Sequence, residues 1–254
     1  MHKGIKIALW ISFTILVMIT LAFTSKKHDE TLCKKPIITI EKYGDNNFLN
    51  EKIILTTLFN KGFKFKDQYL SEINIMQVEQ IVKELPEVEA AEVYKNIDGT
   101  IRIDITERNP VLRIFNNRGQ SFYVDHNGEV MPLSNHFVSH THVATGNINI
   151  GYKGNKQKLT DNSIVSQLYA VADHIRNDEF LNSQIVQIDV DKKQEIVLIP
   201  RVGEQKILFG KGTNIEDKFK RLKIFYKKGI KPHELNNYTT LNLKYKQQII
   251  CSKR

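Results

Sequence analysis

The hydrophobic pattern of the chain begins with an unbroken run. Residues 7–25 hold no charged side chain, and a helix of this length spans about 28 Å, close to the thickness of the hydrocarbon core of a bilayer. Lysines flank the run on both sides. We therefore expect an uncleaved transmembrane helix over residues 7–25, with a tail over 1–6 and a linker over 26–35. The residues expected to anchor it in the membrane include Trp10, Ile11, Leu16 and Leu21.

A cleaved signal peptide is the main alternative, because Ala22 and Thr24 form a small-x-small pattern. However, the apolar run exceeds the usual hydrophobic region of about 7–15 residues, and Lys26 follows it almost at once. A lipoprotein is disfavoured because no lipidation motif precedes Cys33. The orientation stays open here, since two lysines precede the run and four soon follow it, while long domains translocate largely regardless of such counts.

After the linker, the pattern changes to short strands and amphipathic helices. Asn50 is placed to cap one helix, and Asn74 with Gln77 resembles a capping pair for a second. Gly99 lies in a turn between two alternating segments. These signals predict a small β-α-α-β-β domain over residues 36–108. Its elements are expected at residues 36–41, 50–61, 74–85, 88–94 and 100–106.

The remaining residues, 109–254, predict a strand-rich domain with two main helices, so that the whole chain is expected to be an α+β protein. One helix is expected over residues 159–177. A capping box of Thr213 and Glu216 is expected to begin the other, which runs to residue 228. The predicted strands are 111–116, 121–125, 130–133, 185–190, 195–200, 205–209, 239–245 and 247–251.

The last two predicted strands continue almost to the end of the chain. A C-terminal strand commonly lies at the edge of its sheet, where its backbone N–H and C=O groups are open to pairing by a partner chain. An edge covered by the protein's own tail is the alternative. The residues expected to bind such a partner are Tyr238, Leu241, Leu243, Lys244, Tyr245, Gln247 and Ile249.

Composition limits the classes of protein. With 41% apolar and 26% charged residues over 254 positions, the chain is neither disordered nor a disulfide scaffold. The net charge of +9 invites anionic partners, and for an exported domain those are lipids and wall polymers rather than nucleic acid. Cys33 and Cys251 show no metal-ligand spacing, and whether they pair is left open.

Candidate chemistry is sparse, so we expect no enzymatic activity, cofactor or metal. The sequence from Gly210 to Thr213 fails the phosphate-loop pattern and is better explained as a turn into a helix. His140 and His142 lack further ligands nearby and are expected in a loop. Asp125 lies beside a turn glycine and is expected to accept hydrogen bonds from turn amides rather than to act as an acid or base. The basic helix after residue 215 is either a solvated face or a contact for lipid headgroups or an acidic partner.

Several short motifs, in this order and spacing, resemble the bacterial FtsQ/DivIB family. Residues 101–110, with Glu107-Arg108-x-Pro110, resemble the junction between that family's domains, and residues 122–130 resemble its next hairpin. Further matches follow at residues 145–146, 207–210, 218–222 and 238–245. The resemblance covers nearly the whole chain and implies a POTRA domain over 36–108 and an FtsQ-type β domain over 109–254.

The resemblance also implies location and partners. The family plan has a cytoplasmic N-terminus, a single inner-membrane span and a periplasmic C-terminal domain at the division septum. It implies a non-enzymatic divisome scaffold that binds FtsB- and FtsL-like proteins by strand addition, with FtsW or the septal transpeptidase as further partners. Lys244 stands where the family has arginine, so whether it forms an ion pair is left open. The alternatives are another POTRA-bearing export or envelope-assembly factor, and a secreted enzyme with a removable signal.

Overall fold

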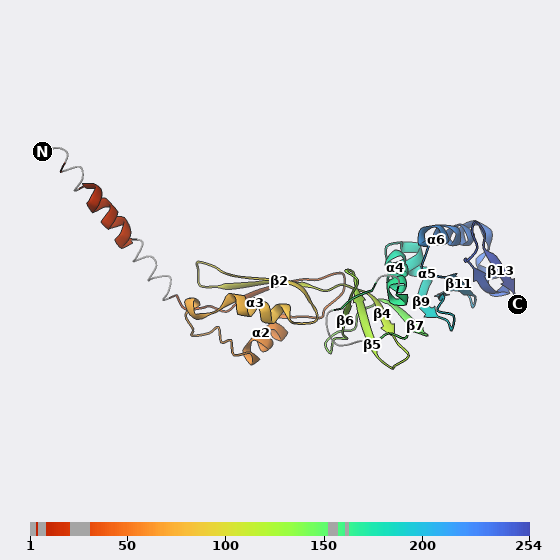
Figure 1. Cartoon of the computed structure of the whole chain (residues 1–254), viewed down its shortest axis with the longest axis horizontal. Coiled ribbons are helices and arrows are strands. Elements are labelled where there is room, and N and C mark those ends of the chain that lie inside the picture. Colours follow the sequence, from red (N-terminus) through yellow and green to blue (C-terminus); the bar gives the residue numbers. More distant parts are fainter. Residues whose placement is uncertain (1–3, 5–8, 21–30, 152–156, 161–162) are drawn as a thin grey trace. The chain divides into compact units, whose positions relative to one another are not determined.

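The computed structural model describes residues 4, 9–20, 31–151, 157–160 and 163–254 (Figure 1). The chain divides into two compact units. Unit 1 comprises residues 1–42 and 49–107, and unit 2 comprises residues 43–48 and 108–254. The segment 43–48 thus belongs to the second unit although unit 1 continues after it.

The described part of the N-terminal apolar run is a helix over residues 9–20. Trp10, Ile11 and Leu16 are exposed on it, and the ring of Trp10 meets that of Phe13 edge-on at a centroid distance of 6.4 Å. Leu21 and the other ends of the predicted span, residues 7–8 and 21–25, lie outside the described residues. Within the residues described, no helix combines the length and apolar character needed to cross a bilayer.

Unit 1 has the predicted β-α-α-β-β order. Its elements are β1 (Ile37–Glu41), α2 (Glu51–Asn60), the short 3-10 helix η1 (Leu70–Glu72), α3 (Ile75–Lys83), β2 (Val88–Lys95) and β3 (Ile101–Glu107). β3 lies at the centre of the sheet, parallel to β1 and antiparallel to β2.

Local sequence explains where these elements begin. The Asn50 side chain accepts a hydrogen bond from the Ile53 amide at 3.0 Å, and that of Asn74 accepts one from the Gln77 amide at 3.2 Å, so both predicted caps are confirmed. Gly99 has φ +88° in the turn between β2 and β3, and a Cβ there would lie 3.0 Å from the Leu32 carbonyl oxygen. Only glycine fits this turn without strain.

Unit 2 is a ten-stranded sheet with helices. Its strands are β4 (Pro110–Phe115), β5 (Ser121–Asp125), β6 (Glu129–Met131), β7 (His142–Gly146), β8 (Gln157–Lys158), β9 (Ile185–Val190), β10 (Ile196–Pro200), β11 (Lys206–Gly210), β12 (Tyr238–Asn242) and β13 (Ile250–Lys253). Its helices are α4 (Ile164–Arg176), α5 (Glu179–Gln184), α6 (Ile215–Ile224), the π-helical turn η2 (Phe225–Gly229) and the 3-10 helix η3 (Pro232–Asn237).

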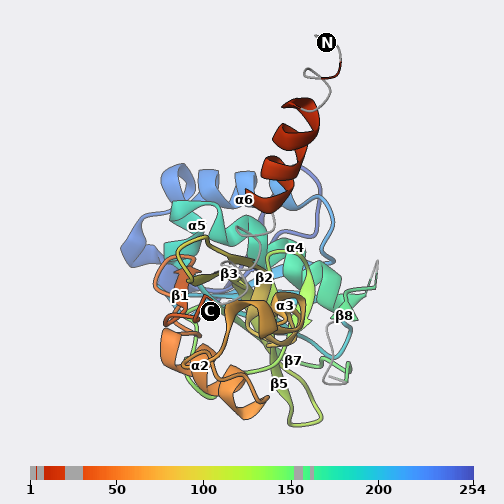
Figure 2. The same ribbon diagram turned by 90° about the vertical axis from the view of Figure 1, so that its left-hand side faces the viewer.

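The strand order in this sheet is β13-β12-β11-β10-β9-β7-β4-β5-β6-β8. Helices α4, α5 and α6 lie together over one face of it in both views (Figure 1 and Figure 2). The core between helices and sheet is apolar, with Leu168, Val171 and Phe219 of the helices buried among strand residues such as Ile188 and Leu241. The α+β class that the sequence predicts is therefore confirmed.

Three local predictions in unit 2 are corrected. The helix predicted from residue 159 begins at Ile164, because the Ser163 side chain caps it by accepting from the Ser166 amide at 3.0 Å. The capping box of Thr213 and Glu216 does not form. Asn214 precedes α6 in the left-handed conformation, with φ +52° and no side-chain cap. Strands β7 and β8 and helix α5 are absent from the prediction.

Candidate partner-binding site

One end of the sheet of unit 2 is formed by the two C-terminal strands, β12 and β13. β12 is parallel to β11 and antiparallel to β13, with Leu241 opposite Cys251 and Asn242 opposite Ile250. β13 pairs with β12 alone among the strands that the structure describes. The outer side of β13 is therefore a sheet edge, the feature that strand addition requires.

This arrangement corrects which strand forms the edge. The last two predicted strands, 239–245 and 247–251, are together expected to be open, but β12 has its own chain on both sides and only β13 lies at the end of the sheet. Pairing stops at Asn242, the chain turns through residues 243–249, and β13 returns along β12. β13 therefore covers the side of β12 that would otherwise be open, and the open edge of the sheet is the outer side of β13, residues Ile250–Lys253.

The predicted site residues fall into two groups. Leu241 and Leu243 are completely buried in the core of unit 2, and Tyr238 and Ile249 are partly buried against it. Lys244, Tyr245 and Gln247 are exposed in the turn between β12 and β13. The leucines therefore support the sheet from inside, while the turn residues face solvent beside the edge.

Two apolar side chains are exposed at this end of the sheet. Tyr245 is 50% exposed and Ile250 is 43% exposed. An aromatic and a β-branched residue beside an open strand are suited to the side-chain contacts that accompany backbone pairing. Tyr245 is among the residues expected to bind a partner, whereas Ile250 is not, although it lies within the predicted strand 247–251.

Arg221 of α6 holds the turn in place. Its Nη1 donates to the carbonyl oxygens of Tyr245 at 2.9 Å and Gln248 at 2.6 Å, and its Nη2 donates to that of Leu243 at 3.2 Å. Its Nε is 3.0 Å from a carboxylate oxygen of Asp217, one helical turn earlier. One side chain thus satisfies three carbonyls that lie outside the sheet ladder. The sequence signals for it are the i, i+4 spacing of Asp217 and Arg221 and the family-like segment 218–222.

Lys244 forms the ion pair that the sequence left open, but with its own chain. Its Nζ lies 2.9 Å from a carboxylate oxygen of Glu195. That hydrogen bond is the main cause that raises the pKa of the Lys244 ammonium. Gly210 lies under the same side chain, with φ +77°, and a Cβ there would come within 2.8 Å of the Lys244 Cγ. Only glycine at position 210 leaves room for the side chain of Lys244 in this place.

The Asp125 carboxylate, considered above as a possible acid or base, has several partners within the fold. The Asp125 carboxylate accepts from the amides of Asn127 at 3.0 Å and Glu129 at 2.8 Å, which confirms its predicted role in the turn. Its second oxygen lies 2.6 Å from Nη2 of the buried Arg108. A group with this many internal partners has little freedom to act as a catalytic base.

The structure also shows the environment of the candidate histidines and cysteines. His142 Nε2 lies 3.1 Å from the carbonyl oxygen of Ile185, and burial lowers the pKa of its ring. His140 and His142 line a polar cavity of about 650 Å³ in unit 2. Within the residues described, no group of three potential metal ligands occurs. Cys33 and Cys251 are free thiols, and burial raises the pKa of each.

The phosphate-loop alternative finds no support in the geometry between Gly210 and α6. The Gly212 amide donates to the Gln167 side chain at 2.8 Å, and Lys218 Nζ donates to the Lys211 carbonyl oxygen at 2.7 Å. The Gly212 amide and the Lys218 ammonium are therefore used within the fold, as expected of a turn that leads into a helix.

Comparison with known families agrees with this architecture. Residues 31–106 match the model of a POTRA-like domain, and residues 109–252 match the model described as FtsQ/DivIB, C-terminal related. No curated protein matches the chain. Both matched domains come from non-catalytic families. Because the second match alone covers more than half of the sequence, the chain belongs to the FtsQ/DivIB family of cell-division proteins.

Proposed function

We propose that this protein is a non-enzymatic scaffold of the bacterial divisome, which binds an FtsB- or FtsL-like partner by strand addition at β13. The observation that carries the proposal is that, among the strands described, β13 pairs with β12 alone and so leaves its outer side open. The domain that contains this strand matches a family of cell-division proteins. Backbone hydrogen bonds to the added strand would provide affinity, and neighbouring side chains would provide specificity.

The proposed contact surface consists of β13 and the turn that precedes it. Tyr245 and Ile250 supply exposed apolar surface, and Gln247 supplies a polar group. Leu241 and Leu243 are assigned a supporting role, because both are buried beneath the sheet. Lys244 is assigned to Glu195 rather than to the partner.

We further propose that residues 7–25 anchor the chain in the inner membrane. Residues 1–6 would then be cytoplasmic, and residues 36–108 and 109–254 would form two periplasmic domains at the septum. This proposal rests on the uncharged N-terminal run and on the family's membrane location. In this arrangement the sheet edge is presented to partners anchored in the same membrane.

The proposed edge is tested by site-specific photocrosslinking in cells. A photoreactive amino acid at Ile250 or Tyr245 should capture one small division protein, identified by mass spectrometry. The matched control is Leu133, an exposed apolar residue that follows β6, eight strands away from β13 in the sheet order. Capture from Leu133 as efficient as from Ile250 would argue against an edge site.

The contribution of the side chains is tested by substitution. Tyr245→Glu and Ile250→Glu each place a charge in the proposed contact, and each should weaken binding of an FtsB-like segment by about tenfold or more. Leu133→Glu, the same change elsewhere on the sheet, should leave binding unchanged.

Depletion of the protein should produce filamentous cells. A defect in export or outer-envelope assembly without filamentation would favour the alternative class of POTRA-bearing factor.

A further inference from the structure

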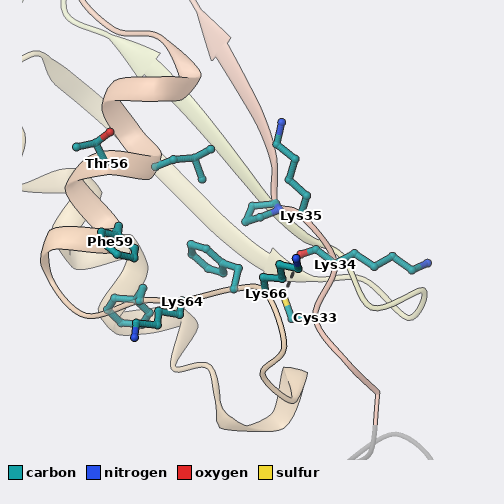
Figure 3. A pocket seen from close by; sticks show the side chains of 11 residues that line it. Cys33, Lys34, Lys35, Thr56, Phe59, Lys64 and Lys66 are labelled. Atoms are coloured by element: carbon teal, nitrogen blue, oxygen red, sulfur yellow. Dashed lines mark hydrogen bonds between the residues drawn. The ribbon is translucent and has the colours of Figure 1, made fainter.

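Unit 1 contains an apolar cavity of about 850 Å³ between α2 and the segment that leads into β1. Thr56 and Phe59 project from α2 on one side, and Cys33, Lys34 and Lys35 lie on the other (Figure 3). The segment of residues 63–66 completes the lining. The volume falls within the range of about 300–1,000 Å³ that is typical of small-molecule sites.

The lining of this cavity is mainly apolar and partly open to solvent. Phe65 and Cys33 of the lining are buried, and the rings of Phe63 and Phe65 stack at a centroid distance of 6.4 Å. Phe59, also in the lining, is 59% exposed. Leu32 and Ile37, which flank the lining segment in sequence, are also exposed. Exposed apolar surface gathered around a cavity is typical of a site that binds an apolar ligand.

The charged residues of the lining are all lysines. Lys34, Lys35, Lys64 and Lys66 contribute to it, and no carboxylate does so in the part of the chain that the structure describes. Two acidic groups lie nearby, since Lys35 pairs with Glu51 at 2.7 Å and Lys34 acts electrostatically on Asp98. The remaining charge of the lining is positive, which complements an anionic ligand.

The backbone beside the cavity is already paired. The amide of Cys33 donates to the Gln68 carbonyl oxygen at 2.8 Å, and the amide of Lys34 donates to that of Gly99 at 3.0 Å. A peptide strand added here would lack these two donors. An acyl chain needs no hydrogen bond, so the lining suits a lipid chain better than an extended peptide.

The cavity also lies near the proposed anchor along the chain. Cys33 follows the apolar run by eight residues, so even a fully extended connection would span no more than about 29 Å. We propose that the cavity binds the acyl chain of an anionic phospholipid, with Lys64 and Lys66 beside its headgroup. This inference rests on the proposed membrane anchoring, and it assigns unit 1 a second attachment to the bilayer.

Photolabelling of the full-length protein tests the inference. The protein is reconstituted in phosphatidylcholine vesicles with and without phosphatidylglycerol, and the probes are both lipids carrying a diazirine on the acyl chain. Adducts are mapped by mass spectrometry. We expect the phosphatidylglycerol probe to label peptides covering residues 55–66, and to do so several times more strongly than the phosphatidylcholine probe.

Charge reversal provides the matched comparison. Lys64→Glu with Lys66→Glu should reduce labelling of residues 55–66 by at least about tenfold, because one lysine near an anionic surface contributes roughly fivefold in affinity. Lys52→Glu with Lys61→Glu makes the same charge change at exposed positions outside the lining and should leave labelling unchanged. All four lysines are exposed, and equal thermal midpoints would verify that both variants fold.

The outcomes separate this inference from the proposed function. Label on residues 9–20 without label on residues 55–66, or equal labelling by both lipids that the Lys64 and Lys66 changes do not alter, would overturn the lipid site and leave the anchor intact. Absence of label from both regions would overturn the anchor and the lipid site together. None of these three results bears on the β13 edge, which is measured by partner capture.

Discussion

Towards its two ends, the sheet of unit 2 is organised by two arginines that act in different ways. Arg108 is buried, with 2% of its side chain exposed, and its guanidinium meets the equally buried Asp125 carboxylate. Arg221 is 13% exposed, and its main partners are backbone carbonyl oxygens of the turn before β13. Arg108 binds the carboxylate of a buried turn residue, whereas Arg221 binds the carbonyl oxygens of an exposed turn beside the open edge of the sheet.

The difference follows from what each charge can reach. Arg108 donates to Asp125 through Nε at 2.7 Å and to the Val130 carbonyl oxygen through Nη1 at 3.3 Å, with Glu129 3.6 Å away. A buried ion pair with such partners is costly to break from one side. Arg221 donates to neutral oxygens, and its carboxylate partner Asp217 is 60% exposed. We therefore expect Arg108 to control stability and Arg221 to control the order of the edge.

The largest effect is expected at Arg108. Asp125→Asn keeps an acceptor for the turn amides but removes the nearer counter-charge of the arginine and leaves only Glu129 at 3.6 Å, and should lower the free energy of unfolding by about 3–5 kcal/mol. Arg108→Met should have a similar effect. Urea unfolding of the full chain, with hydrogen exchange in unit 1 as an internal reference, measures this loss. A loss below about 1 kcal/mol would show that the pair behaves like a surface ion pair.

Arg221→Gln is expected to rank second. It removes a charged donor from three carbonyls, and should cost about 1–3 kcal/mol. Its distinguishing result is local, because amide exchange should accelerate in residues 243–253 and not around Asp125. Binding of the FtsB-like segment should weaken in parallel. Uniform acceleration across unit 2 would contradict a specific role at the edge.

Asp178 provides a control for the variants at Arg108 and Arg221. Its side chain caps α5 by accepting from the Leu181 amide at 3.0 Å, and it pairs with Lys223 of α6. The hydrogen bond from Lys223 is the first cause that lowers its pKa. Asp178→Ala should cost about 1–2 kcal/mol at neutral pH without loosening β13.

The pH dependence of this effect has a definite sign. Because the folded pKa of Asp178 is depressed, its stabilisation is present above the unfolded value of about 3.9 and is lost as pH falls through the folded value. The difference in unfolding free energy between wild type and Asp178→Ala should therefore be constant above about pH 5 and shrink below pH 4. A difference that grows on acidification would exclude this carboxylate as the cause.

How far apart two bonded groups lie along the chain determines whether the sequence could predict their contact. The caps formed by Asn50 and Asn74 and the turn bonds of Asp125 join groups within four residues, so each could be predicted from local spacing. The contact of Asp125 with Arg108, 17 residues away, could not. Arg221 bonds to carbonyls 22 to 27 residues away, and only the folded sheet brings them together. Alternation identified the last strands, but not that β13 would return along β12 and take over the edge.

The smallest effect is expected at the ion pair beside the edge. Lys244 and Glu195 are 49 residues apart and partly exposed, so their contribution should be under about 1 kcal/mol and should fall at high salt. Because the pKa of Lys244 is raised in the folded state, this stabilisation is present below the unfolded value of about 10.4 and lost as pH rises through the folded value.

A partner that instead used Lys244 would give a different result. Lys244→Gln should change the affinity for the FtsB-like segment less than about twofold, because the ammonium is engaged by Glu195, whereas Tyr245→Glu should abolish most of it. Glu195→Gln is the companion variant, since it releases Lys244 while leaving the lysine in place. If Lys244→Gln weakened binding as much as Tyr245→Glu, the lysine would be a direct contact and the proposed surface would extend from β13 across the turn towards β10.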